Sequence, residues 1–256
     1  MISSNYLTFP FHVPRIIGTF RNWPLYLFNY ATHRRGPAEY LLRSGFRLMD
    51  GFGSLAGTLT VVFIRREYGD VRAYRTIVDI GANMGSFAVY AALNSPESRI
   101  YCYEPEEGNF QVLKQNIQIN GLEQRVFLFE YAVGAHEGHR DIVLREAAEH
   151  SFYAEGTAGR TQTVRCTTLP KIFEFQDLDQ IDLLKVNCEG AEYEIFEGCE
   201  PDHYGRILNI TMEYHNMSTE RNGRRLTELL RSKGYRIRRF SKYRGVSGFI
   251  WATRDE

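Results

Sequence analysis

Apolar runs alternate with helical segments over most of the chain. One apolar run at residues 76–80 stops at Gly81 and gives way to a helical pattern over residues 86–93. A second run at residues 99–103 leads into a helical pattern over about residues 108–120. This order of strand, glycine turn, helix and strand predicts a βαβ unit with parallel strands.

The rest of the chain extends this unit into a larger sheet. Further elements are predicted as strands at residues 126–131, 183–186 and 207–212, a hairpin of residues 141–144 and 163–166, and helices at residues 169–175, 192–197 and 220–233. The last two runs, residues 235–240 and 248–253, are joined by a turn too short for a crossover helix, so they should pair antiparallel. We expect a doubly wound, mostly parallel α/β domain over residues 76–256 with an antiparallel C-terminal hairpin.

The first 75 residues are predicted to form an N-terminal cap on this domain. They hold four of the eight prolines and many aromatic residues, and their helical periodicity is weak. The pattern predicts a short helix at residues 24–32, and at residues 46–49 and 58–64 either two strands or a strand and a helix. Packing of the aromatic side chains in a cap is favoured over a membrane-associated flap.

Composition indicates a globular protein with no overall preference for a polyanion. Hydrophobic residues make up 43% and charged residues 24%, and 31 Lys or Arg balance 31 Asp or Glu. Residues 218–244 nevertheless contain ten Lys or Arg against Glu220 and Glu228. A solvated basic face is the favoured interpretation, and peripheral contact with a membrane or an anionic acceptor is the alternative.

Cysteine spacing and hydropathy point to a reducing compartment. Cys102, Cys166, Cys188 and Cys199 show no C-x-x-C spacing, so neither a zinc site nor a disulfide framework is indicated. No run approaches the roughly 18 apolar residues needed to span a bilayer, and a secretory signal pattern is absent. We therefore expect a cytoplasmic protein.

The glycine turn after the first strand of the βαβ unit is the leading candidate for a ligand site. Asp79, Gly81 and Gly85 read D-x-G-x-x-x-G at a strand end, where glycines let the backbone approach a ligand closely. A dinucleotide loop would carry a glycine at the position of Asn83. The Asp79 carboxylate suits an ammonium better than a diphosphate, so the loop indicates a positively charged ligand.

An acidic residue at the end of the next strand indicates that the expected ligand contains a nucleoside. Glu104 follows the glycine loop by about twenty residues, where a carboxylate can accept hydrogen bonds from two ribose hydroxyls. Tyr131 and Ala132, at the end of the third strand, are expected beside the adenine ring. Because nicotinamide and methyl-donor cofactors share the adenosine, a nicotinamide oxidoreductase stays open at this point.

Four segments together resemble the FkbM family of methyltransferases: VDIGANMG at residues 78–85, YEP at 103–105, LKVNCEGAE at 184–192 and MEYH at 212–215. The resemblance covers roughly residues 60–250. It implies a seven-stranded, Rossmann-like methyltransferase fold, S-adenosyl-L-methionine as cofactor, and O-methylation of a hydroxyl on a sugar, glycolipid, polyketide or related metabolite. The residues predicted to bind the cofactor are Asp79, Gly81, Asn83, Gly85, Ser86, Phe87, Glu104, Pro105, Asn109, Tyr131, Ala132 and Asn187.

The acceptor is expected at the carboxyl ends of the fourth and fifth parallel strands, where open sheets bind ligands. Four polar residues fall there: Asn187, Glu189, Glu213 and His215. The family usually carries Asp at the position of Asn187, and an amide cannot act as a base. Glu189 and His215 are therefore the predicted proton acceptors, with Glu213 as their orienting partner or a ligand of the substrate hydroxyl. A structural role for His215 stays open, and no metal is predicted, although these three side chains leave a divalent cation as the less favoured alternative.

Other polar residues near these segments are interpreted as structural. Glu192 and Glu194 are expected to face solvent or to cap the short helix that they begin. His136 and His139 lie in a glycine-containing loop without further ligands nearby and are interpreted as surface residues.

Two rival functions accompany the predicted small-molecule or glycan methyltransferase. The basic C-terminal quarter would suit a nucleic-acid methyltransferase, but the Asn-Cys-Glu-Gly that starts at Asn187 differs from the amide, two prolines and aromatic residue of base-amine methyltransferases. A non-catalytic cofactor-binding protein is the second rival, because of Asn187. Acceptor specificity is expected in the N-terminal segment and the insertion at residues 146–165, with Ser151 and Tyr153 as candidate lining residues.

Overall fold

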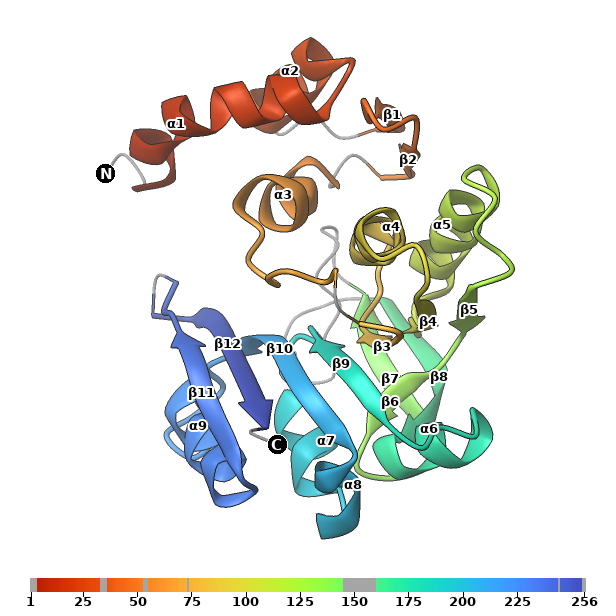
Figure 1. Cartoon of the computed structure of the whole chain (residues 1–256), viewed down its shortest axis with the longest axis vertical. Helices are drawn as coiled ribbons and strands as arrows, with labels where there is room; N and C mark the ends of the chain where they lie inside the picture. Colours follow the sequence, from red (N-terminus) through yellow and green to blue (C-terminus); the bar gives the residue numbers. More distant parts are fainter. Residues whose placement is uncertain are drawn as a thin grey trace.

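A computed structural model of the chain describes residues 4–32, 36–52, 55–72, 74–144, 160–243 and 245–254, with the side chains of residues 4–10 excepted. A seven-stranded sheet forms its centre (Figure 1). The strands follow in the order β11 (Tyr235–Phe240), β12 (Ser247–Arg254), β10 (Ile207–His215), β9 (Ile181–Val186), β3 (Thr76–Ile80), β4 (Arg99–Tyr103) and β5 (Val126–Phe129). Only β12 runs antiparallel to its neighbours in this sheet. The predicted mostly parallel sheet with an antiparallel C-terminal hairpin is confirmed.

Helices cover both faces of this sheet. One face carries α4 (Ser86–Asn94) and α5 (Glu107–Gln118), and the other carries α6 (Leu169–Phe175), α7 (Glu192–Glu197), α8 (Pro201–Gly205) and α9 (Gly223–Ser232). Successive residues of a strand point to opposite faces, so Ile77 packs with the first group and Val78 with the second. Burial on both faces explains why the strands read as continuous apolar runs.

A small second sheet interrupts the α/β pattern after β5. It has the order β6 (Ala132–Gly134), β8 (Arg160–Thr168), β7 (Gly138–Leu144). The predicted hairpin is present, with Asp141 opposite Thr163 in an antiparallel register. Strand β6 was not predicted, because three residues are too few to show a periodicity. Ser151 and Tyr153 lie outside the described residues.

The N-terminal segment is more helical than its sequence indicates. It consists of α1 (Ser4–Thr19), α2 (Trp23–Thr32), β1 (Ala38–Leu41), β2 (Arg47–Asp50), α3 (Leu55–Leu59) and the π-helix η1 (Thr60–Arg65). The predicted helix at residues 24–32 is confirmed, and of the two readings of residues 46–49 and 58–64 the structure shows the strand and the helix. Helix α1 was missed because it contains Pro10 and Pro14, which are unusual inside a helix.

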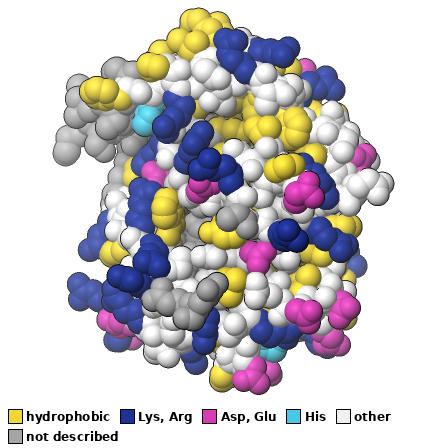
Figure 2. Space-filling view, viewed as in Figure 1, with side chains coloured by type: hydrophobic (Ala, Val, Ile, Leu, Met, Phe, Trp, Pro, Cys, Tyr) yellow, Lys and Arg dark blue, Asp and Glu magenta, His cyan; other side chains and the backbone are white. Residues whose placement is uncertain are grey.

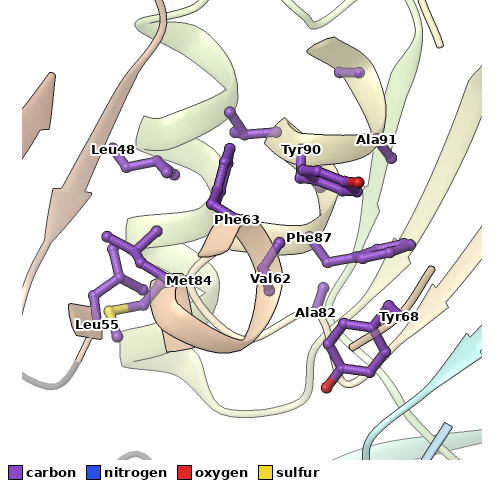
Figure 3. Close-up of a cluster of buried hydrophobic side chains, with 14 of the residues drawn as sticks. Leu48, Leu55, Val62, Phe63, Tyr68, Ala82, Met84, Phe87, Tyr90 and Ala91 are labelled. Carbon is purple, nitrogen blue, oxygen red and sulfur yellow. The ribbon is translucent and has the colours of Figure 1, made fainter. Parts of the chain in front are cut away.

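The N-terminal segment shares one apolar core with the sheet. Phe20 stacks on Tyr26 with their ring centroids 4.7 Å apart, and both belong to the same buried cluster as Leu113 of α5. Figure 3 shows Phe63 of η1 beside Tyr90 of α4, with their ring centroids 5.4 Å apart. The predicted cap therefore covers the α4 and α5 face of the domain, and the described residues show no gap in the core between the two.

Polar side chains of α5 and of the turn that follows it connect this cap to the domain through hydrogen bonds. Asn116 is fully buried, accepts the N–H of Met49 at 2.6 Å and donates to the carbonyls of Met49 at 3.0 Å and Met84 at 2.7 Å. Asn120, one turn further, makes the equivalent pair of bonds to the backbone of Arg47. Strand β2 is thus hydrogen-bonded to α5 through side chains.

In the described part of the chain, no helix combines the length and apolar character needed to cross a membrane.

Candidate functional site

A cavity opens at the carboxyl ends of β3, β4 and β9, the edge where parallel sheets bind ligands. The space between its walls amounts to about 630 Å³ when the open solvent at its mouth is included. Its walls are formed by Ile80, Gly81, Asn83, Tyr103, Glu104, Pro105, Glu106, Asn109, Tyr131, Ala132, Val133, Ile142, Asn187, Cys188 and Glu189.

The glycine loop is held tightly against the next strands. Gly81 has φ +74°, and a Cβ at this position would lie 1.8 Å from the carbonyl oxygen of Asn187. Its N–H and that of Ala82 both donate to the carbonyl of Tyr103, at 2.9 and 3.0 Å. Only glycine fits here, because both the left-handed backbone and the close approach exclude a side chain.

Glu104 presents a fixed carboxylate to the cavity. One oxygen accepts the N–H of Asn83 at 2.8 Å and the other accepts the N–H of Glu106 at 3.1 Å. The side chain is only 5% exposed, and burial raises its pKa to about 7. Because each carboxylate oxygen can accept two hydrogen bonds, one site on each oxygen remains for a ligand hydroxyl. This geometry fits the two hydroxyls of a ribose.

Asp79 is paired inside the protein. Its carboxylate is completely buried and lies 2.7 Å from the Nζ of Lys185, which also donates to the carbonyl of Gly81 at 2.7 Å. Burial raises the pKa of Asp79, whereas Lys185 lowers it. Asp79 does not line the cavity, so in this structure it supports the glycine loop through Lys185. Direct contact between Asp79 and a ligand ammonium stays a prediction.

The structure places most of the predicted cofactor residues on the cavity wall. Those that line it are Gly81, Asn83, Glu104, Pro105, Asn109, Tyr131, Ala132 and Asn187, with Glu189 from the predicted catalytic group. Three others do not line the cavity: Gly85, Ser86 and Phe87. A Cβ at Gly85 would lie 2.7 Å from Leu113, so this glycine allows α4 and α5 to pack closely, and Phe87 belongs to the core.

Several wall residues were missed by sequence reasoning. They are Ile80, Tyr103, Glu106, Val133, Ile142 and Cys188. Ile80 and Tyr103 are the last residues of β3 and β4, so their position at the strand ends was a usable signal. Ile142 comes from the inserted sheet, and no local pattern indicated that this strand reaches the cavity.

Asn187 connects the site to the N-terminal segment. Its Nδ2 donates to the hydroxyl of Tyr68 and to Oε2 of Glu213, each at 3.1 Å. Tyr68 lies between the rings of Phe87 and Phe249 and is almost fully buried. An amide at position 187 can donate to the Glu213 carboxylate, which an aspartate could do only when protonated.

His215 lies between two carboxylates. Its Nδ1 is 3.0 Å from Glu192 and its Nε2 is 3.4 Å from Glu189. Burial is the largest single influence and lowers the pKa of His215, but the hydrogen bond to Glu192 and the charges of Glu192, Glu189 and Glu213 together raise it to about 9. These contacts favour the protonated ring, which has no lone pair left to accept a further proton. The role of His215 as a proton acceptor stays a prediction, as does its structural alternative.

Glu192 and Glu194 were expected to face solvent or to cap their helix, and the structure excludes a solvent-facing position for both. Glu192 is 0% exposed, and its Oε1 accepts the N–H groups of Cys188 at 3.1 Å and Gly190 at 3.3 Å, just before the helix begins. Glu194 lies mostly buried between Arg140 and Arg221. In the sequence, Glu192 and Glu194 are recognisable only as the start of a short helix. Their contacts with His215 and with the two arginines form only in the folded structure.

Among the described residues, no group of three or more His, Cys, Asp or Glu side chains is arranged to hold a metal ion.

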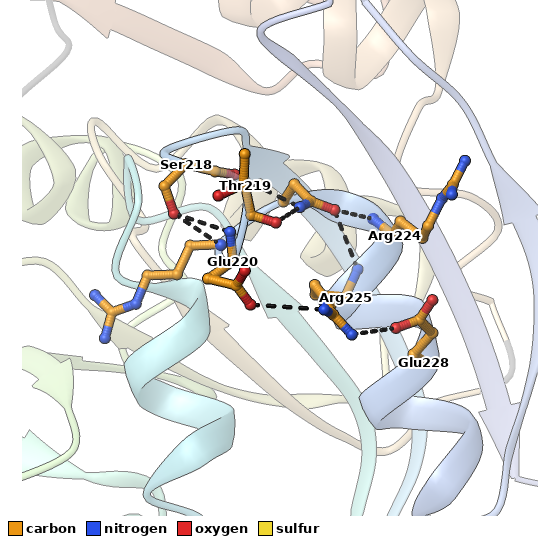
Figure 4. Close-up of polar contacts among 8 residues, drawn as sticks. Ser218, Thr219, Glu220, Arg224, Arg225 and Glu228 are labelled. Carbon is orange, nitrogen blue, oxygen red and sulfur yellow. Dashed lines mark hydrogen bonds and ion pairs between the residues drawn. The ribbon is translucent and has the colours of Figure 1, made fainter.

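The basic region of residues 218–244 is partly neutralised by ion pairs. Figure 4 shows Arg225 between Glu220, at 3.6 Å, and Glu228, at 3.2 Å. Arg221 and Arg239 also have carboxylate partners. Figure 2 shows Lys and Arg side chains over much of the face in view, with several of them along its left side. Contact of this region with a membrane or an anionic acceptor stays a prediction, and its last residue, 244, lies outside the described residues.

A seven-stranded α/β sheet with a nucleoside-compatible cavity at its carboxyl edge defines a Rossmann-like architecture. The chain belongs to the FkbM family of S-adenosylmethionine-dependent methyltransferases, since the FkbM methyltransferase domain model matches residues 79–237. The earlier alternative of a nicotinamide oxidoreductase is therefore removed.

Three curated relatives cover most of the chain. Methyltransferase sdnD of Sordaria araneosa is 25% identical over 194 residues, which is 64% of this chain and 74% of the relative. Methyltransferase 1 of Beauveria bassiana is 24% identical over 222 residues, or 73% of this chain and 85% of the relative. The 31-O-demethyl-FK506 methyltransferase FkbM of Streptomyces tacrolimicus is 23% identical over 199 residues, or 66% of this chain and 75% of the relative.

Proposed function

We propose that this chain transfers a methyl group from S-adenosyl-L-methionine to a hydroxyl of a sugar, glycolipid, polyketide or similar metabolite. The observation that carries this proposal is the Glu189 carboxylate on the wall of the same cavity that Glu104 lines. The name of the Streptomyces relative, which describes methylation at an oxygen, supports it.

The cavity suits this cofactor on the evidence of its side chains. Glu104 has hydrogen-bond acceptor sites for two ribose hydroxyls, and Tyr131 offers an aromatic ring nearby on the same wall. Asn187 Oδ1 is buried without a hydrogen-bond partner in the structure, and a donor group at the methionine end of the cofactor would satisfy it. When bound, the cofactor supplies an electrophilic methyl carbon attached to a sulfonium sulfur.

Glu189 is the group that receives the acceptor's proton in this proposal. As the new carbon–oxygen bond forms and the carbon–sulfur bond breaks, the hydroxyl proton becomes strongly acidic, so a carboxylate is a sufficient base. Glu189 lines the cavity and its side chain is 29% exposed, which allows an acceptor to approach it. His215 does not take the proton; as a cation it orients the Glu189 carboxylate.

A panel of hydroxylated acceptors, assayed by formation of S-adenosylhomocysteine, tests this function. We expect Glu189→Gln to lower kcat by about 100-fold or more, as is usual for loss of a general base, with affinity for S-adenosylhomocysteine within about twofold. Glu197→Gln is the matched control, because this half-exposed carboxylate lies on the neighbouring helix α7. Methylation of nitrogen only, or full activity of the Glu189 variant, would contradict the proposal.

Neither rival function gains support from the site. A nucleic-acid acceptor would bind through cations of the basic region, and three of these, Arg221, Arg225 and Arg239, are engaged in ion pairs. A non-catalytic protein would give no turnover with any member of the panel while still binding the cofactor.

A further inference from the structure

We propose that Glu192 is a positioning residue of the methyl-transfer centre, which fixes both the backbone on either side of Glu189 and the His215 ring that contacts the Glu189 carboxylate. This inference rests on the proposed function, because it concerns the carboxylate assigned there to receive the proton.

The first support is the backbone around Glu189. Glu189 has φ +51° and Gly190 has φ +112°, two successive residues in a region that a glutamate rarely occupies. Such a conformation is strained for a residue with a side chain and persists only where the surroundings impose it. One oxygen of Glu192 accepts the N–H groups of Cys188 and Gly190, the residues on either side of Glu189. Glu192 therefore imposes the turn that directs Glu189 into the cavity.

The second support is the bridge through His215. The same oxygen of Glu192 lies 3.0 Å from Nδ1 of His215, and the opposite ring nitrogen lies 3.4 Å from Oε2 of Glu189. The hydroxyl of Tyr193 donates to the carbonyl of His215 at 2.6 Å, which holds the backbone of that residue. Glu192 therefore constrains Glu189 at both ends, through its backbone and through its carboxylate.

The third support is the charge balance of the buried cluster. Three carboxylates face the His215 ring from three elements: Glu189 from the loop after β9, Glu192 from α7 and Glu213 from β10. Glu192 is fully buried, and its second oxygen has no hydrogen-bond partner among the described residues, so its charge requires a nearby cation. The Cys188 thiol and the Tyr193 hydroxyl are also titratable groups beside it; their pKa values are raised by burial first and then by Glu192, so neither is a cation. His215, whose Nδ1 lies 3.0 Å from Glu192, supplies this cation.

The direct test compares Glu192→Gln with Glu194→Gln in the full chain. Both variants remove one carboxylate from the same helix, but Glu194 pairs with Arg140 and Arg221 and does not contact His215. An NMR titration of the histidine ring signals reports the pKa of His215, which we expect near 9 in the unaltered chain. In Glu192→Gln it should fall by about 1–3 pH units, the usual effect of removing an opposite charge at this distance, while Glu194→Gln leaves it unchanged.

Kinetics separate positioning from a purely structural role. With an acceptor identified in the panel, Glu192→Gln should lower kcat by about 100-fold, the usual cost of misplacing a reacting group, and leave KM for S-adenosylmethionine within about twofold. An unchanged His215 pKa, or a kcat equal to that of Glu194→Gln, would overturn the proposal. If Glu192→Gln fails to fold, Glu192→Asp is assessed by the same criteria. Binding of S-adenosylhomocysteine without methylation of any acceptor would refute the proposed function, while the titration would still report on the Glu192–His215 pair.

Discussion

Glu104 is the residue through which pH should control cofactor binding. Burial raises the pKa of its carboxyl to about 7, and two ribose hydroxyls donate more strongly to the deprotonated form, whose hydrogen bonds are charge-assisted. The free protein loses stability as the pH rises from the unfolded value of 4.5 towards 7, because the charged form is disfavoured in the folded state. Ligand hydroxyls would lower this pKa again, so binding and deprotonation are coupled.

We therefore predict that affinity for S-adenosylhomocysteine falls up to about tenfold for each pH unit below 7 and levels off above it. Calorimetry across this range, in buffers of different ionisation enthalpy, measures the affinity and the protons released. Glu104→Gln should bind weakly and without this pH dependence. Equal affinity of the unaltered chain at pH 5.5 and 8 would count against the role of Glu104.

Gly81 should be the least replaceable position of the loop. An alanine Cβ would lie 1.8 Å from the Asn187 carbonyl oxygen, in a left-handed backbone, so Gly81→Ala should destabilise the protein by about 3–5 kcal/mol and abolish cofactor binding. Gly121→Ala is the control, since it also has positive φ but no atom within 4 Å, and should cost only about 1–2 kcal/mol. Urea denaturation compares them, and equal losses would contradict the steric argument.

At the residue scale, the sequence predicted the nucleoside end of the site better than the reacting end. Glu104 and Gly81 were identified because their roles follow from their positions at strand ends. The charge of His215 depends on Glu192, which lies 23 residues away in the chain and comes next to the ring only in the folded structure. Tyr68, which contacts Asn187 across 119 residues, lies in a segment with weak periodicity and was missed for the same reason.

At the scale of elements, helix α5 connects the domain to the N-terminal cap. Asn116→Ala would leave the backbone groups of Met49 and the carbonyl of Met84 without partners in a buried region, so we expect a loss of about 2–4 kcal/mol. Asn120→Ala removes a similar set of bonds at a half-buried position and should cost about 0.5–1 kcal/mol. Chemical denaturation of both variants checks this, and a larger loss for Asn120→Ala would refute it.

The elements predicted from the sequence are those with strong, local patterns. The parallel strands and helices α4, α6 and α7 begin within one or two residues of their expected positions, because apolar runs and glycine or proline boundaries mark them. Residues 58–64 are rich in β-branched side chains, which favour strands, but packing of Val62 and Phe63 against α4 makes them helical. Tertiary contacts thus decide the segments where local preference is weak.

At the scale of the whole molecule, the continuous core predicts one cooperative unit. Residues 1–75 supply Phe20, Tyr26 and Phe63 to the cluster that also buries Phe87 and Leu113. The full chain should unfold in a single calorimetric transition, and a chain that starts at residue 76 should lose cooperative unfolding because the α4 face would be exposed to water. A shortened chain that unfolds cooperatively and binds S-adenosylhomocysteine would instead support an independent domain after residue 75.

The central claim is that the cavity at the strand ends holds S-adenosylmethionine through the Glu104 carboxylate. Titration calorimetry of the full chain with S-adenosylhomocysteine at pH 8 tests it most directly. The structure predicts one binding site per chain and, for Glu104→Ala, an affinity lower by about 10–100-fold, the usual effect of losing two charge-assisted hydrogen bonds. Absence of binding to the unaltered chain, or equal binding by Glu104→Ala, would contradict it.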